Sequence, residues 1–170
     1  MTTSEVTLKM IQQANGNLHD INHFMKVYAF AKTIGESENL TKEQQLTLEI
    51  AAIVHDIACP LCREKYGNTN GKYQEAESAA LLEDFFAGTS IPQDMQERVI
   101  FLVSHHHTYE GVDGMDYQIL LEADYLVNAE ESHYSDDNIQ NARVKIFGTR
   151  TGIVLLDAMY GVVEREGRFV

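Results

Sequence analysis

The chain has 170 residues, 44% of them hydrophobic, and a formal net charge of −13 at pH 7. That length allows one domain with a substantial core, and because we find no repeat, low-complexity tract or linker, we expect residues 1–170 to form a single domain. The negative charge would repel a nucleic acid backbone, no hydrophobic run approaches the ~20 residues that span a bilayer, and the N-terminus lacks a signal-peptide pattern. We therefore expect a cytoplasmic protein that binds neither a nucleic acid polymer nor a membrane.

Hydrophobic residues recur with helical spacing along almost the whole chain, and no alternation of period two is long enough to build a sheet. The sequence therefore predicts an all-α fold, a bundle of about seven or eight helices. Gly35 is placed to end the second helix, and Thr41 with Gln44 forms a capping box that begins the third. The expected helices cover residues 5–14, 18–34, 41–57, 74–87, 92–106, 117–129, 137–147 and 152–163, and the last two (137–163) would cover the core.

Residues 59–73 carry several glycines and asparagines, which predict turns and a long loop. Cys59 and Cys62 form a lone Cys-x-x-Cys element within it. A zinc ribbon needs a second pair, and a redox motif would open a helix after a strand, so we interpret them as two reduced thiols in a loop.

A His55-Asp56 dipeptide follows the apolar run 48–54 at the end of the third expected helix. A carboxylate against an apolar core is tolerated only when it is paired, hydrogen-bonded or bound to a cation. The adjacent imidazole makes a transition metal the most economical partner.

Two further polar residues interrupt apolar helical faces: His23 in the second expected helix and Asp124 in the sixth. Taken singly, each could be a hydrogen-bonded core residue or a helix cap. Together with His55 and Asp56 they come from three helices, and one divalent cation would satisfy all four. We therefore expect these residues to converge on a metal.

A run of three histidines, His105, His106 and His107, ends the fifth expected helix. His106 shares a helical face with Val99 and Val103, so at least one imidazole should point inward. We take His105 and His106 as site candidates, and interpret His107 as part of a solvated helix end favoured by the helix dipole.

The order His23, His55-Asp56, Asp124 resembles the HD superfamily of metal-dependent phosphohydrolases. The resemblance covers about residues 17–130, including the segments 23–31 and 122–128 around the first and last of these residues. It implies an all-α fold, a metal held by His23, His55, Asp56 and Asp124, and attack of a metal-activated water on a phosphate ester. A bound divalent ion would lower the pKa of that water and offset phosphoryl charge.

The resemblance also bears on the number of metals. Many dinuclear members place another histidine where this chain has Gln74, and a neutral glutamine is a poor transition-metal ligand. We therefore expect one divalent ion (Mn, Fe, Co, Ni or Zn, with Mg a further candidate) rather than two. Glu75 is a candidate to support a ligand through a hydrogen bond, to bind a second metal weakly or to donate a proton, and Asp56 could accept a proton from the attacking water.

The substrate is less well defined by the sequence. His105-His106 resembles the paired histidines of the cyclic-dinucleotide phosphodiesterase branch, but the proline-containing signature of that branch is missing, so we expect a small phosphorylated substrate, first a nucleotide. Arg63, Lys65 and Lys72 are candidates to bind its phosphate, with solvated loop charge an equal alternative.

Two alternatives and one property stay open. Some HD proteins are di-iron oxygenases, although Gln74 argues against the full ligand set that such chemistry needs. A non-catalytic ligand-binding or regulatory domain could instead keep a metal for stability. The sequence is also compatible with a homodimer.

Overall fold

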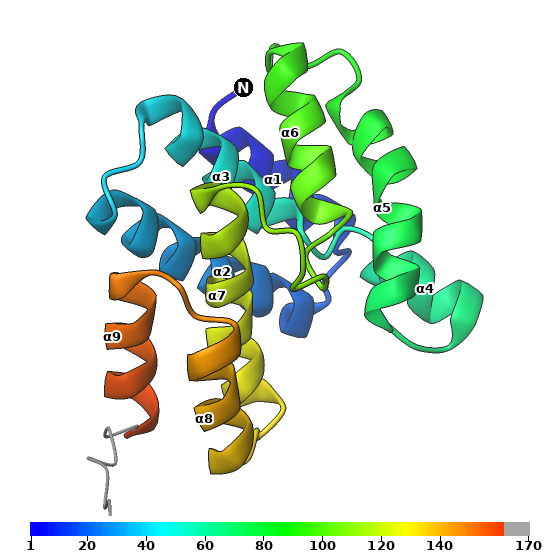
Figure 1. The fold of residues 1–170 in the computed structure, drawn as a ribbon. Coiled ribbons are helices and arrows are strands. Elements are labelled where there is room, and N and C mark those ends of the chain that lie inside the picture. Colours follow the sequence, from blue (N-terminus) through cyan, green and yellow to red (C-terminus); the bar gives the residue numbers. More distant parts are fainter. Residues whose placement is uncertain (162–170) are drawn as a thin grey trace, which may run out of the picture.

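The computed structural model describes residues 1–161, which form a bundle of α-helices and contain no β-strand (Figure 1). The all-α expectation is therefore confirmed for this part of the chain. The end of the last expected helix, at residues 162 and 163, lies outside the described residues. The helices are α1 (Thr3–Gln13), α2 (Leu18–Ser37), α3 (Lys42–Val54), α4 (Cys59–Tyr66), α5 (Gly71–Phe86), α6 (Gln93–Val103), α7 (Met115–Glu131), α8 (Asp136–Lys145) and α9 (Arg150–Tyr160).

The prediction of a long loop over residues 59–73 is wrong, because α4 occupies its first half. Pro60 lies in the first turn of α4, where a missing N–H costs no helical hydrogen bond, and Gly67 ends the helix in the left-handed conformation with φ 71°. Cys59 and Cys62 are free thiols, as expected, but they are buried in a helix. Only residues 67–70 connect α4 to α5.

Helices α2, α3 and α7 form the centre of the bundle, where each packs against the other two. Figure 1 shows α4, α5 and α6 on one side of this centre and α8 and α9 on the other. The five consecutive residues 50–54 of α3 are completely buried, which explains their uniformly apolar character. The expected capping box is confirmed: the Thr41 side chain accepts a hydrogen bond from the Gln44 N–H, and the Gln44 side chain accepts one from the Thr41 N–H.

The segment Lys42–Tyr66 is long and apolar enough to qualify as a membrane span by length and composition. It consists of two helices, α3 and α4, joined by a turn, and 72% of its most apolar window is buried inside the bundle. These are the properties of a core helix. The turn matters for the site, because His55 and Asp56 lie at the point where the apolar helix ends.

Helix α6 ends at Val103, and residues 104–107 form a turn instead of the continued helix that we expected. The Tyr117 hydroxyl donates to the backbone oxygens of His105 and Thr108, both at 2.7 Å. From the other side, Glu75 accepts from the His107 N–H at 3.1 Å and from the Thr108 hydroxyl at 3.0 Å. Helical spacing therefore does not decide which way the three histidines point.

Candidate metal centre

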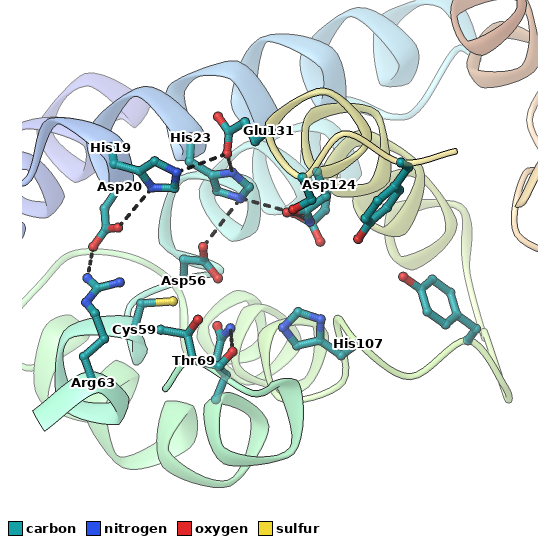
Figure 2. A pocket seen from close by; sticks show the side chains of 15 residues that line it. His19, Asp20, His23, Asp56, Cys59, Arg63, Thr69, His107, Asp124 and Glu131 are labelled. Carbon is teal, nitrogen blue, oxygen red and sulfur yellow. Dashed lines mark hydrogen bonds and ion pairs between the residues drawn. The ribbon is translucent and has the colours of Figure 1, made fainter. Parts of the chain in front are cut away.

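Four side chains from three parts of the fold converge at the centre of the bundle. We call them the primary cluster: His23 from α2, His55 and Asp56 from the turn after α3, and Asp124 from α7. Figure 2 shows His23, Asp56 and Asp124 pointing toward one another. The His23 Nε2 atom lies 3.1 Å from His55 Nε2, 3.2 Å from Asp124 Oδ1 and 3.5 Å from Asp56 Oδ2. The His55 Nε2 atom lies 3.5 Å from Asp124 Oδ1 and 3.7 Å from Asp56 Oδ2.

These separations fit the donor atoms of one metal ion. Ligand atoms that bind an ion at ~2.1 Å lie about 3.0 Å apart in an octahedral arrangement and about 3.4 Å apart in a tetrahedral one. In the primary cluster, the five pairs of such atoms that include His23 or His55 lie 3.1 to 3.7 Å apart, close to these values. Two imidazoles and two carboxylates are a donor set for a first-row divalent ion.

The histidines are held in the orientation that metal binding requires. Each of three buried histidines donates its Nδ1–H to an acceptor outside the cluster, which leaves Nε2 to face inward. The acceptors are the Ala52 carbonyl for His55 (2.8 Å), the Val103 carbonyl for His106 (2.7 Å) and the Glu131 carboxylate for His23 (2.8 Å). Asp124 is fixed in turn by the Asn128 amide, which donates to its Oδ1 at 2.8 Å.

The charges of the primary cluster favour a cation. Burial alone would lower the pKa of His23, but its hydrogen bond to Asp124 and the charges of Asp56 and Asp124 raise that pKa to about 10. Burial would raise the pKa of Asp124, but its hydrogen bonds from His23 and His55 hold it well below the usual range. The pKa of Asp56 is likewise well below its ordinary value, against its burial, because His55, His106 and His23 surround it. The buried carboxylate of Asp124 and the partly buried one of Asp56 thus favour a positive charge between them.

A second group of donor atoms adjoins the first and shares Asp56 with it. We call Asp56, His106 and His107, together with Gln74 from the lining of the same pocket, the second cluster. One ligand atom each from Asp56, His106 and His107 lies within 4.8 Å of the others, and His106 Nε2 is 3.6 Å from Asp56 Oδ1. The Nε2 atoms of His106 and His107 and the Oε1 atom of Gln74 are buried without a hydrogen-bond partner. The Gln74 amide donates to the Thr69 carbonyl at 2.9 Å.

The structure places the histidine run differently from our expectation. His107, which we interpreted as solvated, faces the site, whereas His105 is turned away from it. The His105 Nδ1–H donates to the Phe101 carbonyl at 2.7 Å, and its ring lies 4.4 Å from the Phe101 ring, beside a separate cleft. The cause is the early end of α6 at Val103. Residues 104–107 form a turn, so His105 and His107 do not point as they would in a continued helix.

A pocket of about 310 Å³ opens over the primary cluster. Besides His23, Asp56 and Asp124, its lining includes Arg63 from α4, Thr69, Gln74, His107 and two tyrosines, Tyr109 and Tyr134. Arg63 is the only lysine or arginine among the described residues that line it, and its guanidinium is paired with Asp20. Figure 2 shows this pair at one end of the site and His107 toward the other.

The other candidates for phosphate binding and proton transfer lie elsewhere. The Lys65 ammonium pairs with Glu77 at 2.6 Å, and the Lys72 ammonium lies 4.7 Å from the centre of the Tyr73 ring, so neither lines the pocket. Glu75 is also absent from the pocket lining, because its carboxylate accepts the hydrogen bonds that hold the His107–Thr108 backbone. The structure thus places Lys65, Lys72 and Glu75 outside the pocket lining, and of the three candidate cations only Arg63 lines it.

Two residues that contact the primary cluster were not singled out from the sequence. Asn128 and Glu131 follow Asp124 by four and seven residues, which places all three on one face of α7. That spacing was the available signal.

A family model described as HD domain matches residues 20–142, well over half of the chain, and confirms the resemblance. Neither the curated proteins nor the solved structures contain a match to this sequence.

Proposed function

Because the chain belongs to the HD domain family, we propose that it is a metal-dependent hydrolase of small phosphate esters, with nucleotides as the first substrates to test. The observation that carries this proposal is the convergence of two imidazoles and two carboxylates under a pocket with an arginine at its rim. A divalent ion bound there would polarise a phosphoryl oxygen and lower the pKa of an adjacent water.

The proposed roles follow from where each side chain lies. His23, His55, Asp56 and Asp124 would hold the ion. Asp56 directs Oδ2 toward His23 and His55 and Oδ1 toward His106, and it lines the pocket, so it can accept a proton from the attacking water. Its lowered pKa keeps it ionised at neutral pH, as a proton acceptor must be.

Arg63 is the proposed phosphate-binding residue. Four carboxylates, Asp20, Asp56, Asp124 and Glu131, line the pocket with it, so an anionic substrate needs this one guanidinium. Arginine carries five N–H donors, and a phosphate could use those that Asp20 leaves or displace the Asp20 carboxylate. The volume of about 310 Å³ lies at the lower end of the range of ligand sites, which favours a mononucleotide or smaller ester over a cyclic dinucleotide.

The proposal includes one tightly bound ion in the primary cluster. The donor set favours Mn, Fe, Co, Ni or Zn, with Mg, which prefers oxygen ligands, the weaker candidate. The second cluster offers one carboxylate, two imidazoles and an amide oxygen, so a second ion would bind there more weakly.

A screen of the metal-reconstituted protein against nucleotides, sugar phosphates and cyclic dinucleotides, read as phosphate release, tests the proposal. With an active substrate, Arg63→Gln should raise KM about 10- to 100-fold, the loss of a charge-assisted hydrogen bond. Lys65→Gln removes the same charge from the same helix, but outside the pocket, and should leave KM unchanged. A protein that holds one ion per chain yet turns over no member of the panel would contradict the proposal.

The second cluster also favours one rival function, a di-iron oxygenase, because Asp56 stands between two groups of metal-binding atoms. Elemental analysis separates the two. Two tightly bound irons per chain without phosphate release would favour the oxygenase, and one ion with phosphate release the hydrolase.

A further inference from the structure

We propose that Glu131 is a positioning residue for the metal ligand His23, and that it gives this histidine a higher metal affinity than the neighbouring histidines have. The inference rests on the metal site of the proposed function, but not on the reaction that this site catalyses. Its starting point is one contact: the His23 Nδ1–H donates to Glu131 Oε2 at 2.8 Å.

His23 differs from the other buried histidines of the site in the partner of its Nδ1 atom. His55 and His106 donate to backbone carbonyls of their own helices, three residues earlier in the chain. Only His23 donates to a carboxylate, and that carboxylate comes from another helix, 108 residues away in sequence. A carboxylate acceptor fixes the tautomer and makes the opposite nitrogen a stronger donor to a metal than a carbonyl does.

Glu131 is itself held in place. Its Oε1 atom accepts a hydrogen bond from the Lys26 ammonium at 3.0 Å, and its side chain is only 14% exposed. Figure 2 shows it on the side of the His23 ring away from Asp56. Its two oxygens therefore have separate tasks: Oε2 orients His23, and Oε1 anchors the carboxylate to α2 through Lys26.

The position of Glu131 on α7 makes this arrangement rigid. It follows Asp124 by seven residues, two helical turns, so both carboxylates project from the same face toward α2. One helix thus supplies a ligand, Asp124, and also orients a ligand on the helix packed against it. Removing an outer carboxylate of this kind typically weakens metal binding about 10- to 100-fold.

The adjacent residue provides a matched control. Glu130 also accepts a hydrogen bond from Lys26 at 3.0 Å, but its side chain is 63% exposed and contacts no histidine of the site. Glu130→Ala therefore removes the same charge from the same turn of α7 without altering His23. Lys26→Met removes the anchor of both carboxylates and leaves the Glu131–His23 contact possible.

The test measures Co²⁺ affinity of the full chain by competition with a chelator at fixed pH, without substrate. We expect Glu131→Ala to weaken Co²⁺ binding about 10- to 100-fold. Glu131→Gln should recover part of this loss, since its amide oxygen can still accept from Nδ1, whereas Glu130→Ala and Lys26→Met should stay within about threefold of the wild type. The melting temperature of each metal-free variant reports whether the fold survives, and if Glu131→Ala does not fold, the comparison of Glu131→Gln with Glu130→Gln replaces it.

Equal Co²⁺ affinities for the Glu131 and Glu130 variants would overturn the inference. Because no substrate is present, a chain without phosphatase activity can still pass this test, and an active phosphatase can still fail it.

Discussion

The primary and second clusters share Asp56, but the metal-binding atoms of their other residues differ in the contacts that they make. In the primary cluster, the Nε2 atoms of His23 and His55 contact one another and two carboxylates at 3.1 to 3.7 Å. In the second cluster, three buried donor atoms from His106, His107 and Gln74 have no hydrogen-bond partner.

This difference in contacts determines how strongly each cluster can bind a cation. The primary cluster has two carboxylates, and the pKa of His23 is raised to about 10. The cluster therefore keeps a positive charge, which is a proton in the metal-free protein and a metal ion when metal is bound. In the second cluster, burial and the charge of His106 lower the pKa of His107 to about 4, so this histidine is neutral. The second cluster has one carboxylate, which it shares with the primary cluster, and this makes it a weaker cation site.

Asp56→Ala should have the largest effect, because it removes the one residue common to both clusters. We expect the bound metal to fall from one ion per chain to a small fraction and phosphate release to fall to background. Elemental analysis after dialysis and the substrate screen measure these. Glu64→Ala, which removes an exposed carboxylate from α4, should change neither. Full metal occupancy in the Asp56 variant would mean that the clusters are not linked through this residue.

Gln74→His should bring the metal affinity of the second cluster closer to that of the primary cluster. The new imidazole would replace a buried amide oxygen in the pocket that His107 also lines, and nitrogen ligands bind first-row metals much more tightly than a neutral amide does. We expect the retained metal to rise from one ion to two per chain, by elemental analysis after dialysis against a weak chelator. Gln74→Met should keep one. The comparison fails if the wild-type chain already retains two ions under the same conditions.

Sequence reasoning recovered the residues of the primary cluster because each of them interrupts a regular apolar helical face. His23 and Asp124 lie within long helices, where the period of 3.6 residues reports which side chains point inward. That the four ligate a metal stays a prediction. Their convergence could be inferred because one cation explains all of the interruptions.

The residues of the second cluster could not be predicted from helical spacing in the same way. The direction of His107 depends on a turn held by Glu75 and Tyr117, which are distant in sequence, and no local pattern reports such contacts. The helix α4 was missed for a different reason: the turn residues at 67–71 were given more weight than Pro60, which favours a helix start.

His23 and His107 should respond to pH in opposite directions. His23, with a folded-state pKa of about 10 against an ordinary 6.5, binds its proton more tightly in the folded protein, so metal-free stability is lost as pH rises from about 6.5 through 10. His107, with a pKa lowered to about 4, favours the neutral form, so stability is lost as pH falls from 6.5 through 4. Below the ordinary Asp value of 3.8, protonation of Asp124 removes more.

The metal-free protein should therefore be most stable near pH 6.5, with the unfolding equilibrium changing by up to about tenfold per pH unit on either side. Melting temperatures between pH 3.5 and 10 in the presence of a chelator test this. His23→Gln should reduce the loss of stability on the alkaline side, to which the raised pKa of His106 also contributes, and the exposed His19→Gln should leave the profile unchanged. A flat profile between pH 6.5 and 10 would show that no proton replaces the metal in the primary cluster.

Gly71→Ala should produce the smallest effect, confined to the second cluster. A Cβ atom at this first residue of α5 would lie 2.6 to 2.9 Å from three side-chain atoms of His107, closer than packed atoms can approach. Alanine improves a helix by up to ~1 kcal/mol over glycine, whereas forced overpacking costs about 1–3 kcal/mol. Because Glu75 holds the His107 backbone and rotation of the imidazole cannot move the His107 Cβ atom, part of the overlap remains, and the net effect should be a loss of stability.

In the Gln74→His background, Gly71→Ala should weaken retention of the second ion while the first stays at one per chain, by elemental analysis. Gly67→Ala is the matched control, since a Cβ there meets nothing within 4 Å, although its φ of +71° adds local strain. If Gly71→Ala instead released the first ion, the His107 ring would have to support the primary cluster as well. The two clusters would then be one site joined by Asp56, in which the two ions cannot bind separately.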